Sequence, residues 1–436
     1  MLVSQSSPYP ANADAAASER ALLERRARLL GPTYRAFYRN PTHLVRGSGV
    51  WLYDAQGRKF LDAYNNVASV GHCHPRVVEA LSAQAATLNT HTRYLSEIIL
   101  DYAEKLLGTV PAHLGHAMFT CTGSEANDLA IRIAQHSSGG TGVIITDFAY
   151  HGATIATAQL SPAAVGAKGV PAHHRTVSAP DTFRDHGRAA HDFAKNVAAA
   201  IEDMRTKGIK PAALLLDSAF SSDGIFFPDA AVMRQAADHV KEAGGIVIAD
   251  EVQSGFGRLG QGMWGFANYG IEPDIVTMGK PIGDGHPIGA VLVRPQLVAS
   301  FGSNTGYFNT FGGNPVAAAV GLAVLDVIDG EGLIENARNV GAYTSELLRA
   351  LQGRHGAVAD VRHNGLYFGV ELTADGNEAL AATKTSAVVE AMREDGVLIS
   401  SCGPRGNVLK IRPPLPFARD NAEQLAETLD RALSNW

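Results

Sequence analysis

This chain is poor in cysteine: it has three, Cys73, Cys121 and Cys402, and they lie far apart. An odd number of widely spaced thiols argues against a disulfide framework and fits a reducing compartment. No uninterrupted apolar stretch reaches the roughly 18–20 residues that a membrane span needs. Residues 1–17 also lack the basic segment and the apolar segment that make up a signal peptide. We therefore expect a soluble cytoplasmic protein.

The chain also has no large excess of charge of either sign. Its formal net charge of -6 gives no general attraction to nucleic acid or to anionic membranes. Its 16 histidines are scattered, and His72-Cys73-His74 is the one group that suggests metal ligands. Side chains at adjacent and i, i+2 positions rarely converge on one ion without further ligands. We therefore predict no metal site and no nucleic-acid or membrane partner.

What the chain does have is length and apolar content, with 436 residues of which 46% are hydrophobic. That is enough for two domains. From about residue 75 to residue 320, helical stretches alternate with short apolar runs, which is typical of a mostly parallel sheet with helices on both faces. The expected strands of this sheet are residues 142–146, 213–217, 245–249, 274–277 and 289–293.

Two further regions flank this alternating pattern. Residues 16–30 have the pattern of an amphipathic helix, and residues 50–62 that of a hairpin of two short strands. After about residue 335 the composition becomes more charged, which suggests a smaller C-terminal domain that the hairpin joins. We expect an α/β protein with an N-terminal segment, a large domain and a small α+β domain, over residues 1–60, 61–325 and 326–436.

Lys280 and Asp250 are the most informative residues of the chain. Each ends an apolar run of the kind that makes a buried strand, and burying an isolated charge is very costly. Pyridoxal phosphate would provide a binding partner for both residues. Its aldehyde forms a Schiff base with a lysine, and a carboxylate keeps its ring nitrogen protonated so that the ring accepts electrons. A salt bridge between two strand-end residues is the competing interpretation.

Weaker signals elsewhere fit the same cofactor. Gly123 and Ser124 precede a helix whose N-terminus favours an anion, although a plain N-cap is the commoner interpretation of such a run. Tyr150 follows a strand and could stack on the ring, or it could simply pack in the core. Gln253 could reach the phenolic oxygen of the cofactor, and Thr310 could donate to its phosphate. Each signal is weak alone, but their joint spacing is specific.

The chain resembles the class III aminotransferases, which are fold-type I pyridoxal-phosphate enzymes, from about residue 37 to residue 417. This resemblance implies that Lys280 forms the Schiff base and that Asp250 contacts the ring nitrogen. It also implies a homodimer in which Thr310 reaches the phosphate of the neighbouring subunit's cofactor. The other cofactor-binding residues that it implies are Gly123, Ser124, Tyr150, His151 and Gln253. The segments that carry it are residues 71–75 (GHCHP), 122–127 (TGSEAN), 250–258 (DEVQSGFGR), 273–280 (PDIVTMGK) and 310–315 (TFGGNP).

Three positions depart from the pattern that holds a substrate carboxylate in most members of that family. The usual arginine three residues before a Pro-Pro pair is Lys410, the usual glutamate of an earlier loop is Ser222, and a second arginine of some members is Ala153. Arg412 could replace the usual arginine only through a strand slip of two residues, which we do not expect. The means of holding a dicarboxylate are therefore missing, and a compact ammonium such as Lys410 suits a phosphate.

Within the family, residues 65–75, 88–95, 278–287 and 407–414 look most like the ethanolamine-phosphate phospho-lyases and their phosphohydroxylysine relatives. The resemblance implies a carbon–oxygen lyase that eliminates phosphate from O-phosphoethanolamine or a close phosphorylated amine, giving acetaldehyde and ammonia. An amine or omega-amino-acid transaminase is the alternative, and a non-catalytic binding protein is remote because Lys280 is intact. The candidate residues for the substrate phosphate are, in falling order, Lys410, Asn65, Arg93 and His72.

Overall fold

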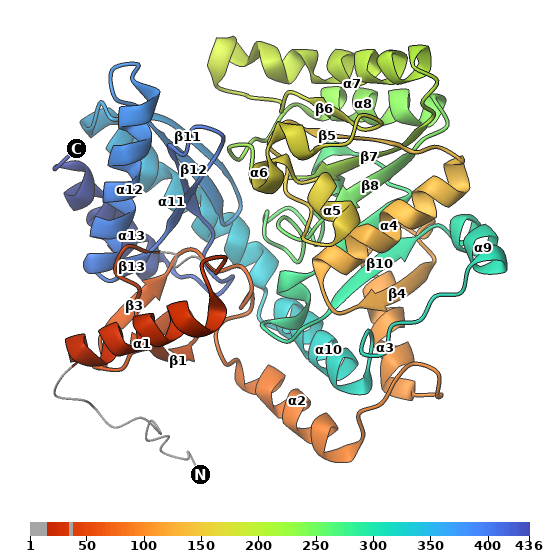
Figure 1. Cartoon of the computed structure of the whole chain (residues 1–436). Coiled ribbons are helices and arrows are strands. Elements are labelled where there is room, and N and C mark those ends of the chain that lie inside the picture. The colour runs from red at the N-terminus through yellow and green to blue at the C-terminus, as the bar shows by residue number, and fades with distance from the viewer. Residues whose placement is uncertain (1–14, 35–37) are drawn as a thin grey trace.

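The computed structural model describes residues 15–34 and 38–436, and Figure 1 shows a larger and a smaller part. Within these residues, the larger part is built on a seven-stranded sheet with the order β4-β10-β9-β8-β7-β5-β6. Its strands are parallel except β10, which runs antiparallel to both β4 and β9. The strands are β4 (His116–Thr120), β5 (Gly142–Thr146), β6 (Arg175–Val177), β7 (Pro211–Asp217), β8 (Ile246–Asp250), β9 (Ile275–Met278) and β10 (Gly289–Val293).

Helices cover both faces of this sheet because its strands are apolar on both sides. Leu214 and Leu216 of β7 pack in the same cluster as residues of α7 and α8, whereas Ala213 and Leu215 pack with residues of α4. This is the doubly covered, mostly parallel sheet that the sequence predicts. The helices of the larger part are α2 (Pro75–Thr87), α3 (Glu97–Leu107), α4 (Gly123–Ser138), α5 (Ile155–Gln159), α6 (Pro162–Val165), α7 (Arg188–Thr206), α8 (Ala230–Glu242), α9 (Pro295–Asn304) and α10 (Pro315–Gly330).

The smaller part combines the two ends of the chain. One sheet has the order β1-β2-β3-β13, in which Leu61 of β3 pairs in parallel with Val397 of β13. A second sheet has the order β11-β12-β15-β14 and is antiparallel. The elements are α1 (Ala15–Leu30), β1 (Leu44–Ser48), β2 (Trp51–Asp54), β3 (Lys59–Asp62), α11 (Leu333–Arg354), β11 (Val358–Asn364), β12 (Tyr367–Leu372), α12 (Glu378–Glu394), β13 (Val397–Leu398), β14 (Ser400–Cys402), β15 (Val408–Ile411) and α13 (Arg419–Leu433).

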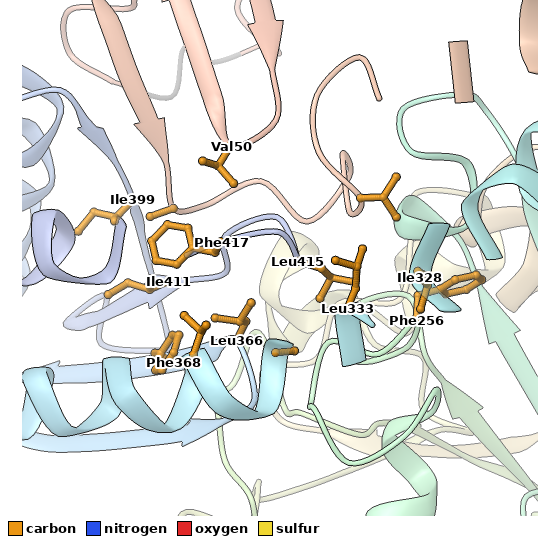
Figure 2. Close-up of a cluster of buried hydrophobic side chains, with 14 of the residues drawn as sticks. Val50, Phe256, Ile328, Leu333, Leu366, Phe368, Ile399, Ile411, Leu415 and Phe417 are labelled. Atoms are coloured by element: carbon orange, nitrogen blue, oxygen red, sulfur yellow. The ribbon is translucent and has the colours of Figure 1, made fainter. Parts of the chain in front are cut away.

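A continuous apolar core joins the two parts. Figure 2 shows Val50, next to the hairpin, close to Ile399 and Phe417 of the C-terminal segment. The same core continues through Leu333 at the start of α11 to Ile328 of α10. The expected α/β fold, with a small α+β domain formed by the N- and C-terminal segments, is confirmed.

The structure also corrects some details of the sequence interpretation. All five expected strands are present, but β10 is antiparallel, and the flanking strands β4 and β6 were not expected. The helix over residues 16–30 and the hairpin over residues 50–62 are both found. The predicted limit between residues 325 and 326 falls inside α10, and the domain limits stay predictions.

The described residues contain neither a membrane-spanning helix nor a metal-binding cluster. No helix within residues 15–34 and 38–436 is long and apolar enough to cross a membrane. In the same part of the chain, no group of three or more His, Cys, Asp or Glu side chains is arranged to hold a metal ion.

Candidate active site

A cavity of about 190 Å³ lies at the carboxyl ends of β7, β8 and β9 and at the N-terminus of α4. This edge of a parallel sheet is where α/β proteins bind ligands. Residues that the sequence analysis did not assign also line it, namely Asn127, Gly152, Asp217 and Val252. The predicted site residues that the structure brings together here are Gly123, Ser124, Tyr150, His151, Asp250, Gln253 and Lys280.

One end of the cavity is the start of α4, which a capping box fixes. Thr122 Oγ1 accepts a hydrogen bond from the amide of Glu125, and the Glu125 carboxylate accepts from the amides of Cys121 and Thr122. The first amides of a helix have no partner within the helix, so those of Gly123 and Ser124 are available to an anion.

The hydroxyl of Ser124 belongs to the same end of the cavity. It accepts a hydrogen bond from the amide of Ala153 at 3.1 Å, so its own proton can be donated to an anion. Gly152 has a φ of +141°, and a Cβ at this position would lie 2.6 Å from Ser124 Oγ. A larger residue would displace the hydroxyl, so the anion site requires glycine here.

Asp250 lies at the end of β8 and is buried, with 4% exposure. Its Oδ2 accepts hydrogen bonds from Asn127 Nδ2 and His151 Nδ1, each at 2.8 Å, and its Oδ1 accepts from the amide of Val252 at 3.1 Å. Asn127 Oδ1 accepts from Thr277 Oγ1 at 2.6 Å, which fixes the orientation of the Asn127 amide. Such donors stabilise a charged carboxylate in a buried place, where it can pair with a protonated ring nitrogen.

Lys280 follows β9 and begins the short 3₁₀ helix Lys280–Gly283. Its φ of +41° is a left-handed conformation, which costs a non-glycine residue about 1–3 kcal/mol and is typical of functional sites. Burial, and then the positive charge of Arg412, lower the pKa of the Lys280 amine to about 8. More of this amine is therefore neutral at pH 7 than in an ordinary lysine. The neutral form is the one that attacks an aldehyde or removes a proton.

Comparisons with known proteins agree with this geometry. Residues 34–433 match the model of the family described as aminotransferase class-III. A Caenorhabditis elegans protein named ethanolamine-phosphate phospho-lyase homolog 1 is 36% identical over 98% of this chain and 96% of its own length. The chain belongs to the class III aminotransferase family. Its sequence resemblance to that family is thereby confirmed.

Two further relatives in the family have different names. A Drosophila melanogaster protein named alanine–glyoxylate aminotransferase 2-like is 39% identical over 91% of this chain and 83% of its own length. A phospholyase from Arthrobacter, solved in complex with phosphoethanolamine, is 44% identical with a TM-score of 0.91. That match covers 95% of this chain and 100% of the solved chain. The matched relatives therefore carry both lyase and aminotransferase-like names.

Class III enzymes use pyridoxal phosphate, which is the cofactor of this chain, and the cavity fits it. The start of α4 with Ser124 would hold the phosphate, Asp250 would pair with the ring nitrogen, and Lys280 would bind the aldehyde. Tyr150 is 45% exposed, so a planar cofactor can cover its ring. His151 donates to Asp250, so it would act on the cofactor through that carboxylate.

Gln253 connects the cavity to Arg412, which we did not expect at the site. Gln253 Oε1 accepts hydrogen bonds from Arg412 Nη1 and, at 3.2 Å, from Asn66 Nδ2, which would leave its Nε2 for the phenolic oxygen of the cofactor. Arg412 is two residues beyond Lys410 of β15, and alternate residues of an extended strand share one side. Arg412 is bonded to Gln253 but is not itself among the described residues that line the cavity, so whether it replaces the usual arginine stays a prediction.

Lys410 is buried in β15, with 7% exposure, and its Nζ donates to the carbonyl of Ser221 at 2.8 Å. Burial, and then the positive charge of Arg412, lower the pKa of Lys410 to about 7. Lys410 is not among the described residues that line the cavity. Its role in binding a substrate phosphate stays a prediction.

The other predicted substrate residues are not brought into the cavity. His72 Nε2 is hydrogen-bonded to Asp62 Oδ2 at 2.7 Å, and Asn65 Oδ1 accepts from the amide of Val67 at 3.0 Å. Both side chains therefore form hydrogen bonds within the local structure of this chain. Direct contact of either with the substrate stays a prediction.

Arg93 and Thr310 lie at the surface of the described chain. Arg93 is exposed, with its Cζ 3.9 Å from the centre of the Phe308 ring. Thr310 is exposed and is not among the described residues that line the cavity. Residues in this position can act only on a second chain or after a rearrangement.

The residues missed at the site had signals of different strength. Asn127 lies at the predicted helix start, and Asp217 ends a predicted strand. Both positions are therefore ones where the sequence predicts a ligand-binding edge of the sheet. Asn66 and Arg412 had no local signal, because they approach Gln253 from segments far away in the sequence.

Proposed function

We propose that this protein is a pyridoxal-phosphate lyase that eliminates phosphate from O-phosphoethanolamine or a close phosphorylated amine. The observation that carries the proposal is the guanidinium of Arg412, which is 4% exposed and contacts Gln253 at the cavity. Within the described chain, Arg412 and the buried Lys410 bond to an amide oxygen and a carbonyl, and neither is paired with a carboxylate. Buried cations need a counter-charge, and a phosphate group carries about two.

The relatives support a phosphorylated substrate. One is named as a homolog of ethanolamine-phosphate phospho-lyase, and a solved phospholyase of 44% identity holds phosphoethanolamine. Ser222 also stands where the resemblance to the family places a glutamate, and Ala153 where it places an arginine of some members. A transaminase is the second candidate, because another relative is named as aminotransferase-like and a guanidinium also binds carboxylates.

The side chains of the site have separate tasks in this reaction. The cofactor, when bound, accepts the electron pair that is released at the substrate carbon bearing nitrogen. Asp250 keeps the ring nitrogen protonated, and Lys280 Nζ removes the proton from that carbon. Arg412 stabilises the phosphate as it leaves with the electron pair of the carbon–oxygen bond. Water then converts the released vinylamine to acetaldehyde and ammonia.

We further propose a homodimer in which Thr310 donates to the cofactor phosphate of the second protomer. The support is that Thr310 is exposed, is not among the described residues that line the cavity and is followed by Phe311, which is 70% exposed. The cytoplasmic location stays a prediction.

The decisive experiment supplies the holoenzyme with O-phosphoethanolamine and no keto acid. We expect phosphate and acetaldehyde to appear in equal amounts. Lys280→Ala should lower the rate by at least about 100-fold, since it removes the general base. Lys195→Ala is the matched control, because the Lys195 side chain is 77% exposed, and it should react like the wild type. If no phosphate appears but pyruvate or 2-oxoglutarate is aminated, the transaminase is correct instead.

A further inference from the structure

Three buried polar atoms, on residues that do not themselves line the described cavity, have no hydrogen-bond partner within the described chain. They are Nε of Arg412, Oη of Tyr367 and Oγ of Ser221, on residues that are 4%, 0% and 0% exposed. The two hydroxyls are near neighbours, and even a bond between them would leave one O–H free to donate. Buried polar groups are nearly always paired, so such a cluster points to an occupant.

The pairing of two strands with a loop of the larger part brings these atoms together. The register of β12 and β15 pairs Phe368 with Ile411, which are the neighbours of Tyr367 and Arg412, and Arg412 Cζ lies 5.9 Å from the centre of the Tyr367 ring. Ser221 belongs to the loop after β7, and its carbonyl accepts from Lys410 Nζ at 2.8 Å. The cluster therefore contains the Arg412 guanidinium, the Lys410 amine and at least two further donors, namely Nε of Arg412 and one of the two hydroxyls.

The charge of this cluster is not balanced by its surroundings. Asp217 is the carboxylate that acts on both Lys410 and Tyr367, and it already accepts hydrogen bonds from the amides of Ala219 and Ser221 at 2.9 and 2.8 Å. A buried water could satisfy the donors but would add no negative charge to the one that Asp217 supplies. A phosphate dianion supplies both charge and acceptor oxygens.

We propose that Arg412, Tyr367 and Ser221 form the pocket for the phosphate group of the substrate, which rests on the proposed function. Arg412 provides charge, and the two hydroxyls provide donors to the further oxygens of a tetrahedral anion. A carboxylate has one charge and two oxygens and leaves part of this set unused. Tyr367 and Ser221 thus select phosphate monoesters over carboxylates.

Tyr367→Phe tests the pocket because it removes one donor and keeps the ring. In the holoenzyme, the KM for O-phosphoethanolamine should rise roughly 10-fold or more, as expected for a hydrogen bond to a charged group. The absorbance of the bound cofactor should stay unchanged. Tyr102→Phe is the matched control, because Tyr102 is also fully buried with an unpaired hydroxyl but stacks on Phe119 in the apolar core. Its KM should equal that of the wild type.

Inorganic phosphate provides a readout that does not depend on turnover. In the holoenzyme, whose cofactor-phosphate site is filled, phosphate should raise the Tm of the wild type and of Tyr102→Phe by mass action. The rise in Tm should be smaller in Tyr367→Phe and in Ser221→Ala. The second variant keeps the test available if Tyr367→Phe does not fold.

Two negative results have different meanings. Equal KM values and equal phosphate responses in all variants would show that water alone occupies the cluster, and would overturn the pocket. If the wild type releases no phosphate from O-phosphoethanolamine, the proposed function fails, while the response to inorganic phosphate still decides whether the cluster binds this anion.

Discussion

Lys410 is a buried cation whose charge depends on pH in the physiological range. Its pKa is lowered to about 7, so the amine is charged below that pH and neutral above it. A substrate phosphate has a second pKa of about 6 and stays a dianion above it. We predict that the KM for O-phosphoethanolamine rises, by up to roughly 10-fold, as the pH rises above about 7, because the attraction of a charged group is lost. Steady-state kinetics across this range measure the effect.

Lys410→Met provides the control, since methionine is unbranched and does not titrate. This variant should have a raised KM without the rise above pH 7. The same change should also make the free energy of unfolding, measured by urea denaturation, depend less on pH. A folded-state pKa below the unfolded value makes Lys410 favour unfolding most at low pH, and that penalty fades between about 7 and 10.5. An unchanged pH profile of KM in Lys410→Met would assign the titration to another group.

The residues around Lys280 differ in how far the sequence could predict them. Lys280, Asp250 and Ser124 stand at strand ends and a helix start, where local pattern alone indicates a ligand edge. Arg412 and Tyr367 come together only through the pairing of β12 with β15. Long-range strand register cannot be derived from local pattern, so the substrate end of the site needed the structure.

At the scale of elements, Glu251 connects the end of β8 to the loop that follows it. The carboxylate is fully buried and accepts from the hydroxyls of Ser218 and Ser254 at 2.6 and 2.9 Å, and from the amides of Gly265 and Phe266 at 2.8 Å each. Hydroxyls can rotate to other acceptors, but the two amides cannot. We predict that Glu251→Ala lowers the free energy of unfolding by about 2–6 kcal/mol, as measured by urea denaturation.

Glu242→Ala is the matched control for this prediction. The Glu242 side chain is 78% exposed at the end of α8, so its loss should change the free energy of unfolding by less than about 0.5 kcal/mol. Equal unfolding free energies for the two variants would mean that water replaces the carboxylate of Glu251, and that the loop does not depend on it.

The strands of the large sheet were predictable to different degrees for a physical reason. β5, β7 and β8 are buried on both faces and therefore read as continuous apolar runs. β6 has three residues and begins with Arg175, and β4 begins with the exposed His116, so neither gives such a run. The antiparallel direction of β10 has no signal in its composition, because a buried strand is equally apolar in either direction.

At the scale of the whole molecule, the two ends of the described chain pack together, while apolar side chains around residues 94–95 and 308–311 are exposed. The pairing of β3 with β13 and the core of Figure 2 join its two ends. By contrast, Leu95, Phe311 and Tyr94 are 102%, 70% and 65% exposed. Ring contacts of His91 with Tyr94 and Phe308 link the two segments that carry them. Exposed apolar groups gathered in this way mark an interaction surface.

We predict that this surface forms the homodimer. We also predict that dimerisation supports cofactor binding, because Thr310 is next to Phe311 of this surface and is proposed to donate to the cofactor phosphate of the second chain. Light scattering should give a dimer for the wild type and a monomer for the double variant Leu95→Glu, Phe311→Glu, and the double variant should bind pyridoxal phosphate more weakly. Leu380→Glu is the control, since Leu380 is 43% exposed on α12 and its replacement should leave the dimer intact. A monomeric wild type, or a monomer with unchanged cofactor affinity, would show that Thr310 does not act across an interface.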